Sequence, residues 1–339
     1  MKKIVFLSVL CLLSSLVMWA QQDPLQFDQS GKFKIVQFTD VHYQPANPAS
    51  KAAIKRIQEV LDAEKPQLVV FTGDIIYARP AAKVIGEVLE TVSSRKIPFV
   101  VTFGNHDDEQ DLKRDKLYDF IRTIPGNRMP ERGKAFSPDY VVEIHASQDV
   151  KQTAALLYCM DSHAYSTLPG VEGYGWISFE QVDWYRRVSL SYTQRNGGNP
   201  LPALAFFHIP LPEYNQAADD VNSPMIGTRM EAACSPVLNT GLFAAMRERG
   251  DVMGVFVGHD HDNDYTVMWK NILLGFGRFT GGNTEYNHLE NGARVFVLQE
   301  GQRSFQTWIR TKGGKTLLHT TYPQSYVKDD WRKRPLSED

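Results

Sequence analysis

Apolar residues along this chain gather in short runs that alternate with longer segments of helical periodicity. Between most of the runs, apolar residues recur at three- and four-residue spacing, as on the buried face of a helix. The runs, which we interpret as strands, are residues 33–39, 67–73, 97–104, 153–160, 203–208 and 251–258. The predicted helices are residues 51–64, 81–94, 112–124, 179–194 and 236–249. This alternation predicts an α/β fold.

The pattern changes after Gly258. Short apolar segments separated by Gly and Asn turns follow, namely YTVMW, NILLGFG, ARVFVLQ and SFQTWIR. They predict a mainly antiparallel ending to the same core. The sequence shows neither a linker nor an internal repeat, so residues 21–339 are predicted to form a single domain.

The first twenty residues have the pattern of a secretory signal. Lys2 and Lys3 precede an apolar run that ends near Ala20, and a polar QQDP stretch follows. This predicts a signal peptide over residues 1–20 and a periplasmic or secreted protein without stable membrane insertion. The alternative is an uncleaved anchor helix, although the run is short for a bilayer that needs about 20 apolar residues.

Two cysteines remain after the predicted cleavage, Cys159 and Cys234. An exported protein can join them in a disulfide, but Cys159 lies within the apolar run AALLYCMD, where a buried free thiol is commoner. The pair does not form a metal-binding cluster, so any metal must be held by His, Asp and Asn.

Charge and composition exclude some classes of partner. Lys and Arg number 37 against 39 Asp and Glu, so the formal charge of −2 favours neither nucleic acid nor an anionic membrane. No basic, aromatic-rich motif is present, and nucleic acid is not expected as a stable partner. With 42% apolar residues, the chain can bury a substantial core.

Polar residues follow five of the predicted strands directly. In open α/β sheets, ligands bind beyond the carboxyl ends of strands, so side chains there are expected to meet at one edge. Alone, Asp40 can be a helix cap, the Gly-Asp pair at Asp74 an ordinary turn, and His208 a core histidine. The motifs GNHD and GHDH are more specific. The residues at these strand ends are Asp40, His42, Asp74, Asn105, His106, Asp107, His208, His259 and His261.

Seven of these side chains can bind a metal, and together they form a mixed nitrogen and oxygen set without a thiolate. This is more than one tetrahedral zinc requires, so the set predicts two metal ions. Imidazole with carboxylate suits Mn, Fe, Zn or Ni, whereas Ca²⁺ prefers oxygen alone. The seven are Asp40, His42, Asp74, Asn105, His208, His259 and His261.

The motifs DVH, GDIIY, GNHD, FFH and GHDH, in this order, resemble the five blocks of the calcineurin-like metallophosphoesterases, which include the purple acid phosphatases. The resemblance runs from about Lys34 to Gly282. AFFHIPLPEYN and GHDHDND are most similar to the branch of purple acid phosphatase 29. The resemblance implies a four-layer α/β/β/α sandwich with two central mixed sheets and the site at the strand ends.

The resemblance also implies a role for each residue. Asp40, His42 and His261 would hold the first metal, Asp74 would bridge both, and the second would be held by Asn105, His208 and His259. His106 would face the substrate as a general acid, oriented by Asp107. The implied activity is hydrolysis of small phosphomonoesters by a hydroxide that bridges two metal ions.

Two alternatives stay open: a phosphodiesterase or nucleotidase on the same metals, and a non-catalytic binding module stabilised by metal. The intact His106 speaks against the second, because a structural site does not need an additional imidazole. Tyr77 has the spacing of a tyrosine ligand in purple acid phosphatases, although DVH keeps the histidine, so Tyr77 is either a ligand or a packing residue. Further residues either line the pocket or are structural, and these are His163, Tyr214, Arg229 and His288.

Overall fold

The computed structural model describes residues 23–132 and 138–327. The predicted signal peptide, residues 1–20, lies outside this part of the chain. Among the described helices, none is long and apolar enough to cross a membrane. The assignment of residues 21–339 to one domain stays a prediction.

The first of two mixed β-sheets has six strands in the order β13-β12-β11-β1-β2-β3. β1, β2 and β3 run parallel, and β11, β12 and β13 add an antiparallel half beside β1. Their bounds are Lys32–Phe38 (β1), Leu68–Thr72 (β2), Phe99–Thr102 (β3), Gly292–Gln299 (β11), Phe305–Thr311 (β12) and Thr316–Tyr322 (β13).

The second sheet has seven strands in the order β4-β5-β6-β8-β10-β9-β7. β5, β6, β8 and β10 are parallel, and antiparallel strands form both edges. The bounds are Tyr140–His145 (β4), Thr153–Cys159 (β5), Ala203–Phe206 (β6), Met225–Ile226 (β7), Val252–Val257 (β8), Thr266–Trp269 (β9) and Ile272–Phe276 (β10).

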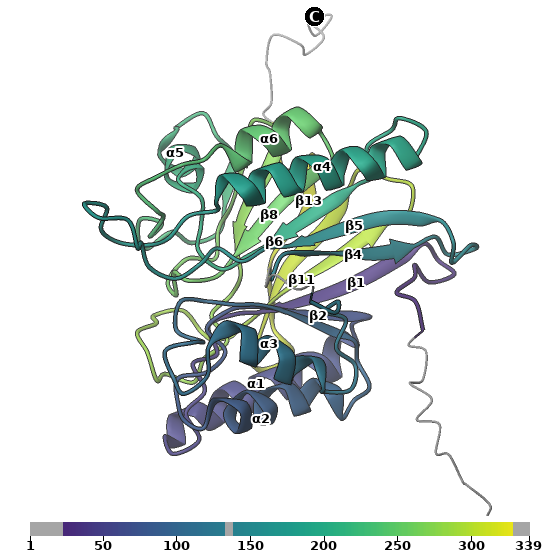
Figure 1. Ribbon diagram of the computed structural model, residues 1–339. Coiled ribbons are helices and arrows are strands. Elements are labelled where there is room, and N and C mark those ends of the chain that lie inside the picture. Colours follow the sequence, from purple (N-terminus) through teal and green to yellow (C-terminus); the bar gives the residue numbers. More distant parts are fainter. Residues whose placement is uncertain (1–22, 133–137, 328–339) are drawn as a thin grey trace, which may run out of the picture.

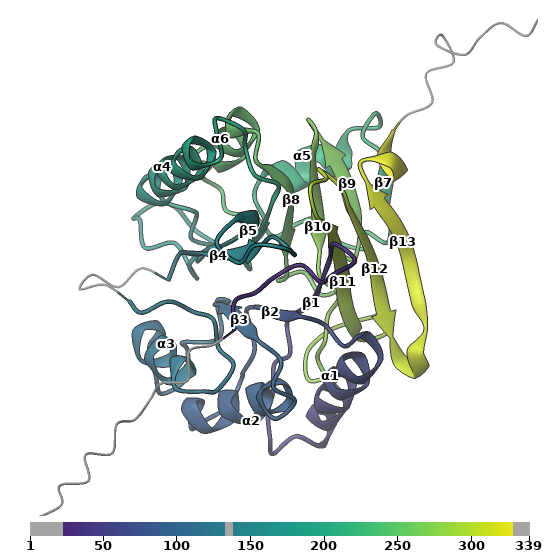
Figure 2. The ribbon, with the colours of Figure 1, turned by 90° about the vertical axis from the view of Figure 1, so that its right-hand side faces the viewer.

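Helices cover the outer face of each sheet, so the molecule has four layers (Figures 1 and 2). α1, α2 and α3 lie on the first sheet, and α4, α5 and α6 lie on the side of the second. Their bounds are Lys51–Glu64 (α1), Ala81–Ser93 (α2), Arg114–Arg122 (α3), Phe179–Arg195 (α4), Glu213–Asp219 (α5) and Leu242–Arg249 (α6). The predicted α/β/β/α sandwich with two central mixed sheets is confirmed.

The apolar strand runs form the interior because they are covered on both faces. Every residue of β2 and β8 is buried, which explains their continuous apolar sequences. Between the sheets, Phe206 and Phe256 from the second sheet pack their rings edge-on against Phe296 of the first. This packing fixes the position of one sheet against the other, and therefore of the loops at their edges.

The structure differs from the sequence prediction in several segments, and strands β4 and β13 were not predicted. The helix predicted over residues 236–249 begins only at Leu242, because Gly241 adopts a left-handed φ of 86° just before it. Residues 212–234, which lie outside the predicted helices and strands, contain α5 and the short strand β7. Cys159 is a buried free thiol, as predicted, and Cys234 is an exposed free thiol, so the two do not pair.

Candidate metal centre

The polar strand ends meet in one place. Loops after β1, β2, β3, β6 and β8 bring their ligand-type side chains together, and each of these side chains is at most 8% exposed. Four of them belong to residues with a positive φ, which non-glycine residues adopt rarely: 52° at Asp40, 44° at His42, 50° at Asp74 and 78° at His259. Such backbone conformations concentrate at functional sites, where the surrounding structure maintains them.

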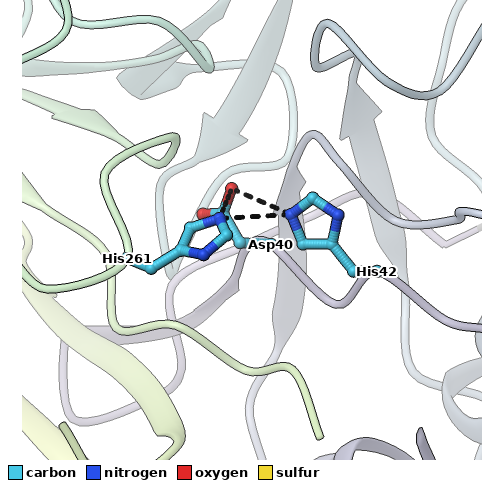
Figure 3. Close-up of side chains that lie close together, drawn as sticks. All are labelled: Asp40, His42 and His261. Atoms are coloured by element: carbon cyan, nitrogen blue, oxygen red, sulfur yellow. Dashed lines mark hydrogen bonds and ion pairs between the residues drawn. The ribbon is translucent and has the colours of Figure 1, made fainter. Parts of the chain in front are cut away.

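The ligand atoms form two groups. Asp40, His42 and His261 make the first (Figure 3), and Asp74, His208 and His259 make the second. Within each group the ligand atoms lie within 4.8 Å of one another. This is the partition between two metals that the family resemblance implies.

Asp74 lies between the two groups. Its Oδ2 is 3.1 Å from Nε2 of His208 and 3.7 Å from Nε2 of His42. Asn105 joins the second group, because its Oδ1 is 3.2 Å from Nε2 of His208. One carboxylate can therefore serve both sites, and an amide completes the second.

The arrangement of donor atoms fits metal ions. Nε2 of His42 lies 3.2 Å from Nε2 of His261, and Nδ1 of His259 lies 3.3 Å from Nε2 of His208. Within the described part of the chain, Nδ1 of His42 and Nε2 of His259 are buried without a hydrogen-bond partner. Burying this many converging nitrogens and carboxylates is costly unless a cation compensates. Imidazole, carboxylate and amide donors without thiolate suit first-row transition metals.

The electrostatics of the site also favour a cation. Burial lowers the pKa of His42 to about 4 and that of His259 to about 3, so both imidazoles are neutral near pH 7. Burial alone would raise the pKa of Asp74, but the charge of His208 holds it well below its usual range. Burial alone would likewise lower the pKa of His208, but Asp74 raises it to about 9. The carboxylates of Asp40 and Asp74, whose pKa values are both lowered, thus favour positive charge in the site, as a proton or as a metal ion.

Two glycines of the motifs allow the strand ends to approach. A Cβ atom on Gly104 would lie 2.1 Å from Oδ1 of Asp74, and one on Gly258 would lie 1.9 Å from Oγ1 of Thr39 and 2.6 Å from Oδ2 of Asp40. All three distances are shorter than non-bonded atoms permit. These positions require glycine because the side chains of Asp74, Thr39 and Asp40 lie directly over their backbone.

Asp107 has a different role from the one predicted. It is fully buried, and its carboxylate accepts hydrogen bonds from the N–H groups of Gly104 (2.8 Å), Asp74 (2.9 Å) and Ile75 (2.7 Å). Burial, with the nearby charge of Asp74, raises the pKa of Asp107 to about 6. The prediction that Asp107 orients His106 is corrected: Asp107 ties the loop after β2 to the loop after β3.

His106 is oriented by a residue that the sequence did not single out. Oε2 of Glu109 lies 2.6 Å from Nδ1 of His106. The hydroxyl of Tyr165 donates to Oε1 of Glu109 at 3.1 Å and accepts from Nδ2 of Asn105 at 3.3 Å. The side chain of His106 is 29% exposed, so it lies at the open edge of the buried metal centre. Contacts through Tyr165 and Glu109 therefore connect Asn105 to His106.

Tyrosine rings surround the centre. The ring of Tyr77 contacts His106 and His42 edge-on, with centroid distances of 5.3 and 6.2 Å. Tyr286 stacks on His261 at 4.5 Å, and its backbone oxygen accepts from Nδ1 of that histidine at 2.8 Å. These contacts orient the imidazoles and make the mouth of the site aromatic.

The remaining candidates are distributed as follows. Tyr214 is in the core, where its hydroxyl donates to the backbone oxygen of Val255, so it is structural. Arg229 pairs with Asp219 at 2.7 Å, and the exposed His288 pairs with Asp262 at 2.6 Å. His163 is exposed, and its Nε2 lies 2.7 Å from Oε1 of Gln181.

The family model described as "Calcineurin-like phosphoesterase" matches residues 33–263. The "Probable inactive purple acid phosphatase 29" of Arabidopsis thaliana is 34% identical over 349 residues, covering 92% of this chain and 88% of that protein. The phosphatase DCR2 of Saccharomyces cerevisiae is 33% identical, over 85% of this chain and 55% of its own length.

Solved structures show the same fold at low sequence identity. A dimetal phosphatase from Danio rerio has a TM-score of 0.58 and 13% identity, over 88% of this chain and 100% of that chain. GAP50 of Plasmodium, described as the anchor in the inner membrane complex, has a TM-score of 0.54 and 11% identity, over 88% and 90% of the two chains. At these identities the likeness concerns the fold alone.

Proposed function

This chain belongs to the calcineurin-like phosphoesterase family, and from this premise we propose that it hydrolyses small phosphomonoesters with two bound transition-metal ions, Fe, Mn or Zn. The observation that carries the proposal is the completeness of the ligand set. All seven predicted ligands are present and buried, six of them form two groups of three, and Asn105 contacts the second group. The word "inactive" in the name of the Arabidopsis relative refers to that protein.

When bound, the two cations would act as Lewis acids on the phosphoryl oxygens and activate water for the attack on phosphorus. Of the imidazoles that would hold them, those of His42 and His259 are already neutral, since their pKa values lie far below 7. Asp74 contributes negative charge between the two groups.

His106 is the group that we propose as the proton donor to the leaving oxygen. Glu109 contacts its Nδ1, which fixes the plane of the ring and leaves Nε2 as the nitrogen that can donate. General acid catalysis of this kind typically contributes about 10²- to 10⁴-fold.

We also propose that the protein acts in the periplasm or outside the cell after removal of residues 1–20. The support is the sequence of that segment, in which two lysines precede an apolar run that ends near Ala20. N-terminal sequencing of the protein exported by its native host tests this, and a mature chain that still begins at Met1 would contradict it.

The test of the activity compares metal-stripped protein with protein reloaded with Mn²⁺, Fe or Zn²⁺, on an aryl phosphate monoester and a diester. We expect metal-dependent turnover that favours the monoester and is lost in Asp74→Asn. A preference for the diester would instead identify a phosphodiesterase. Absence of turnover on both esters with two metals bound would contradict the proposal and favour a binding module.

A further inference from the structure

A hairpin between β5 and α4 reaches the metal centre from the second sheet. It folds back on itself through backbone hydrogen bonds from Ser166 to Gly173 (2.9 Å) and from Gly175 to Ala164 (3.1 Å). The rings of Tyr165 and Tyr174 stack across it at 5.8 Å. The segment of residues 163–178, named here the tyrosine hairpin, is therefore an ordered structure of its own.

Two contacts join the tyrosine hairpin to the metal ligands. The ring of Tyr174 meets His259 edge-on, with centroids 4.4 Å apart. The hydroxyl of Tyr165 contacts Asn105 and also Glu109, the partner of His106. The leaving oxygen of a substrate must lie within hydrogen-bond reach of His106, and Glu109 links His106 to Tyr165 of the hairpin.

Tyr165 also lines a cavity of about 220 Å³. It is smaller than the roughly 300 to 1,000 Å³ of pockets for drug-sized ligands, which suits about one ring. Its wall includes no Lys, Arg, Asp or Glu. The side chains that matter for recognition are His163, Tyr165, Ser166, Thr167, Trp176 and Ser178.

The wall combines flat aromatic faces with free hydrogen-bonding groups. Tyr165 is 47% exposed and offers a ring face. Among the described residues, the hydroxyl of Thr167 and the indole N–H of Trp176 have no hydrogen-bond partner in the protein. Aromatic faces bind rings by stacking, and free donors bind ring hydroxyls or heteroatoms. An uncharged wall disfavours ionised leaving groups, whose desolvation it cannot compensate.

We propose that this cavity is the leaving-group subsite of the enzyme and that it takes an uncharged ring bearing hydrogen-bonding groups, as in a sugar or a nucleoside. The inference rests on the proposed phosphomonoesterase function. It adds the substrate class: monoesters of cyclic, neutral alcohols are preferred over esters of acyclic or charged alcohols.

The test measures kcat/KM of the metal-loaded protein for four probes: glucose 6-phosphate, adenosine 5′-monophosphate, glycerol phosphate and phosphoserine. We expect at least one ring ester to exceed both acyclic esters by about tenfold, a typical gain from one complementary pocket. Two variants should remove this preference and bring the ratio close to one. Thr167→Phe fills the exposed mouth of the cavity, and Trp176→Ala removes the indole. Leu168→Ala, on the same hairpin but outside the wall, should keep the preference.

The result is a ratio of kcat/KM values for two substrates on one preparation. Altered metal loading or partial unfolding lowers both values equally and therefore cancels in the ratio. Equal kcat/KM for ring and acyclic esters, or a ratio unchanged in both variants, would overturn the subsite and leave the phosphatase intact. If no ester is hydrolysed, the proposed function fails. The ring subsite is then tested separately, by saturation-transfer NMR of the binding of free glucose and adenosine. Binding that is lost in Thr167→Phe would support the ring subsite, and absence of binding would overturn it.

Discussion

Glu109 holds His106 through a contact of 2.6 Å between Oε2 and Nδ1, and its other carboxylate oxygen is held by Tyr165 at 3.1 Å. The carboxylate is therefore fixed on both sides. A fixed carboxylate next to an imidazole fixes the orientation of the ring, which a proton donor needs.

We predict that Glu109→Gln lowers kcat about tenfold for alkyl phosphates, which have poor leaving groups and need the proton from His106. Esters of 4-nitrophenol, which leave without protonation, should lose little. The measurement is kcat across a series of leaving groups at constant metal content. Glu131→Gln, at an exposed position, serves as the control. An equal loss on all esters would show that Glu109 acts on metal binding or stability instead.

Gly258→Ala tests the close approach of the strand end after β8 to Asp40. The added Cβ would lie 1.9 Å from Oγ1 of Thr39 and 2.6 Å from Oδ2 of Asp40, so the carboxylate must move. We expect affinity for the first metal to fall about 10- to 100-fold, as for other changes that displace a ligand. Metal titration with fluorescence or calorimetric detection measures this.

Gly86→Ala is the matched control for Gly258→Ala. The position lies in α2, where a Cβ would meet only Phe120 at 3.6 Å. This change should leave metal affinity intact and stabilise the fold by roughly 0.5 to 1 kcal/mol, because alanine loses less backbone entropy in a helix. If both variants bind metal equally well, the loop after β8 is more adaptable than the geometry indicates.

Metal binding should release protons near pH 7. The pKa of His208 in the metal-free protein is about 9, above its ordinary 6.5, so the imidazole is protonated at neutral pH and must lose this proton to bind a cation. Affinity should therefore rise with pH up to about 9, by about tenfold per unit for each proton released. His42 and His259, with pKa values of about 4 and 3, are already neutral and release none.

Calorimetry in buffers with different ionisation enthalpies counts these protons. We expect about one proton from His208 at pH 7. His208→Asn should reduce the count, whereas the surface variant His319→Asn should not change it. An affinity that is independent of pH between 7 and 9 would contradict a protonated His208.

The convergence of the candidate ligands was predictable from the sequence because each follows a strand closely. Once β1, β2, β3, β6 and β8 are recognised from their apolar runs, polar residues at the carboxyl ends of parallel strands are expected at one edge of a sheet. The strands lie in two sheets, whose edges face each other at the site. His208 shows the limit of this argument: alone it resembled a core histidine, and only its place at the end of β6 puts it beside Asp74.

Glu109, Tyr165 and the strand β4 were not predictable in the same way. Glu109 lies in an irregular loop, where the three-residue separation from His106 has no periodic meaning. Tyr165 depends on how a distant hairpin folds over the other sheet. β4 is an edge strand whose burial alternates, so its sequence has a weaker apolar signal than the fully buried β2.

Tyr77 is expected to remain outside the metal coordination sphere. It is 40% exposed, whereas the converging ligands are at most 8% exposed, and its ring packs edge-on against His106 at 5.3 Å. Iron-loaded protein should therefore lack a strong visible phenolate-to-iron band, and Tyr77→Phe should leave the absorption spectrum unchanged. Tyr286→Phe, which alters another half-exposed tyrosine at the site, is the control for ring packing. A visible band that disappears only in Tyr77→Phe would establish phenolate ligation. It would also require the loop after β2, which carries Tyr77, to move toward the metal when the metal binds.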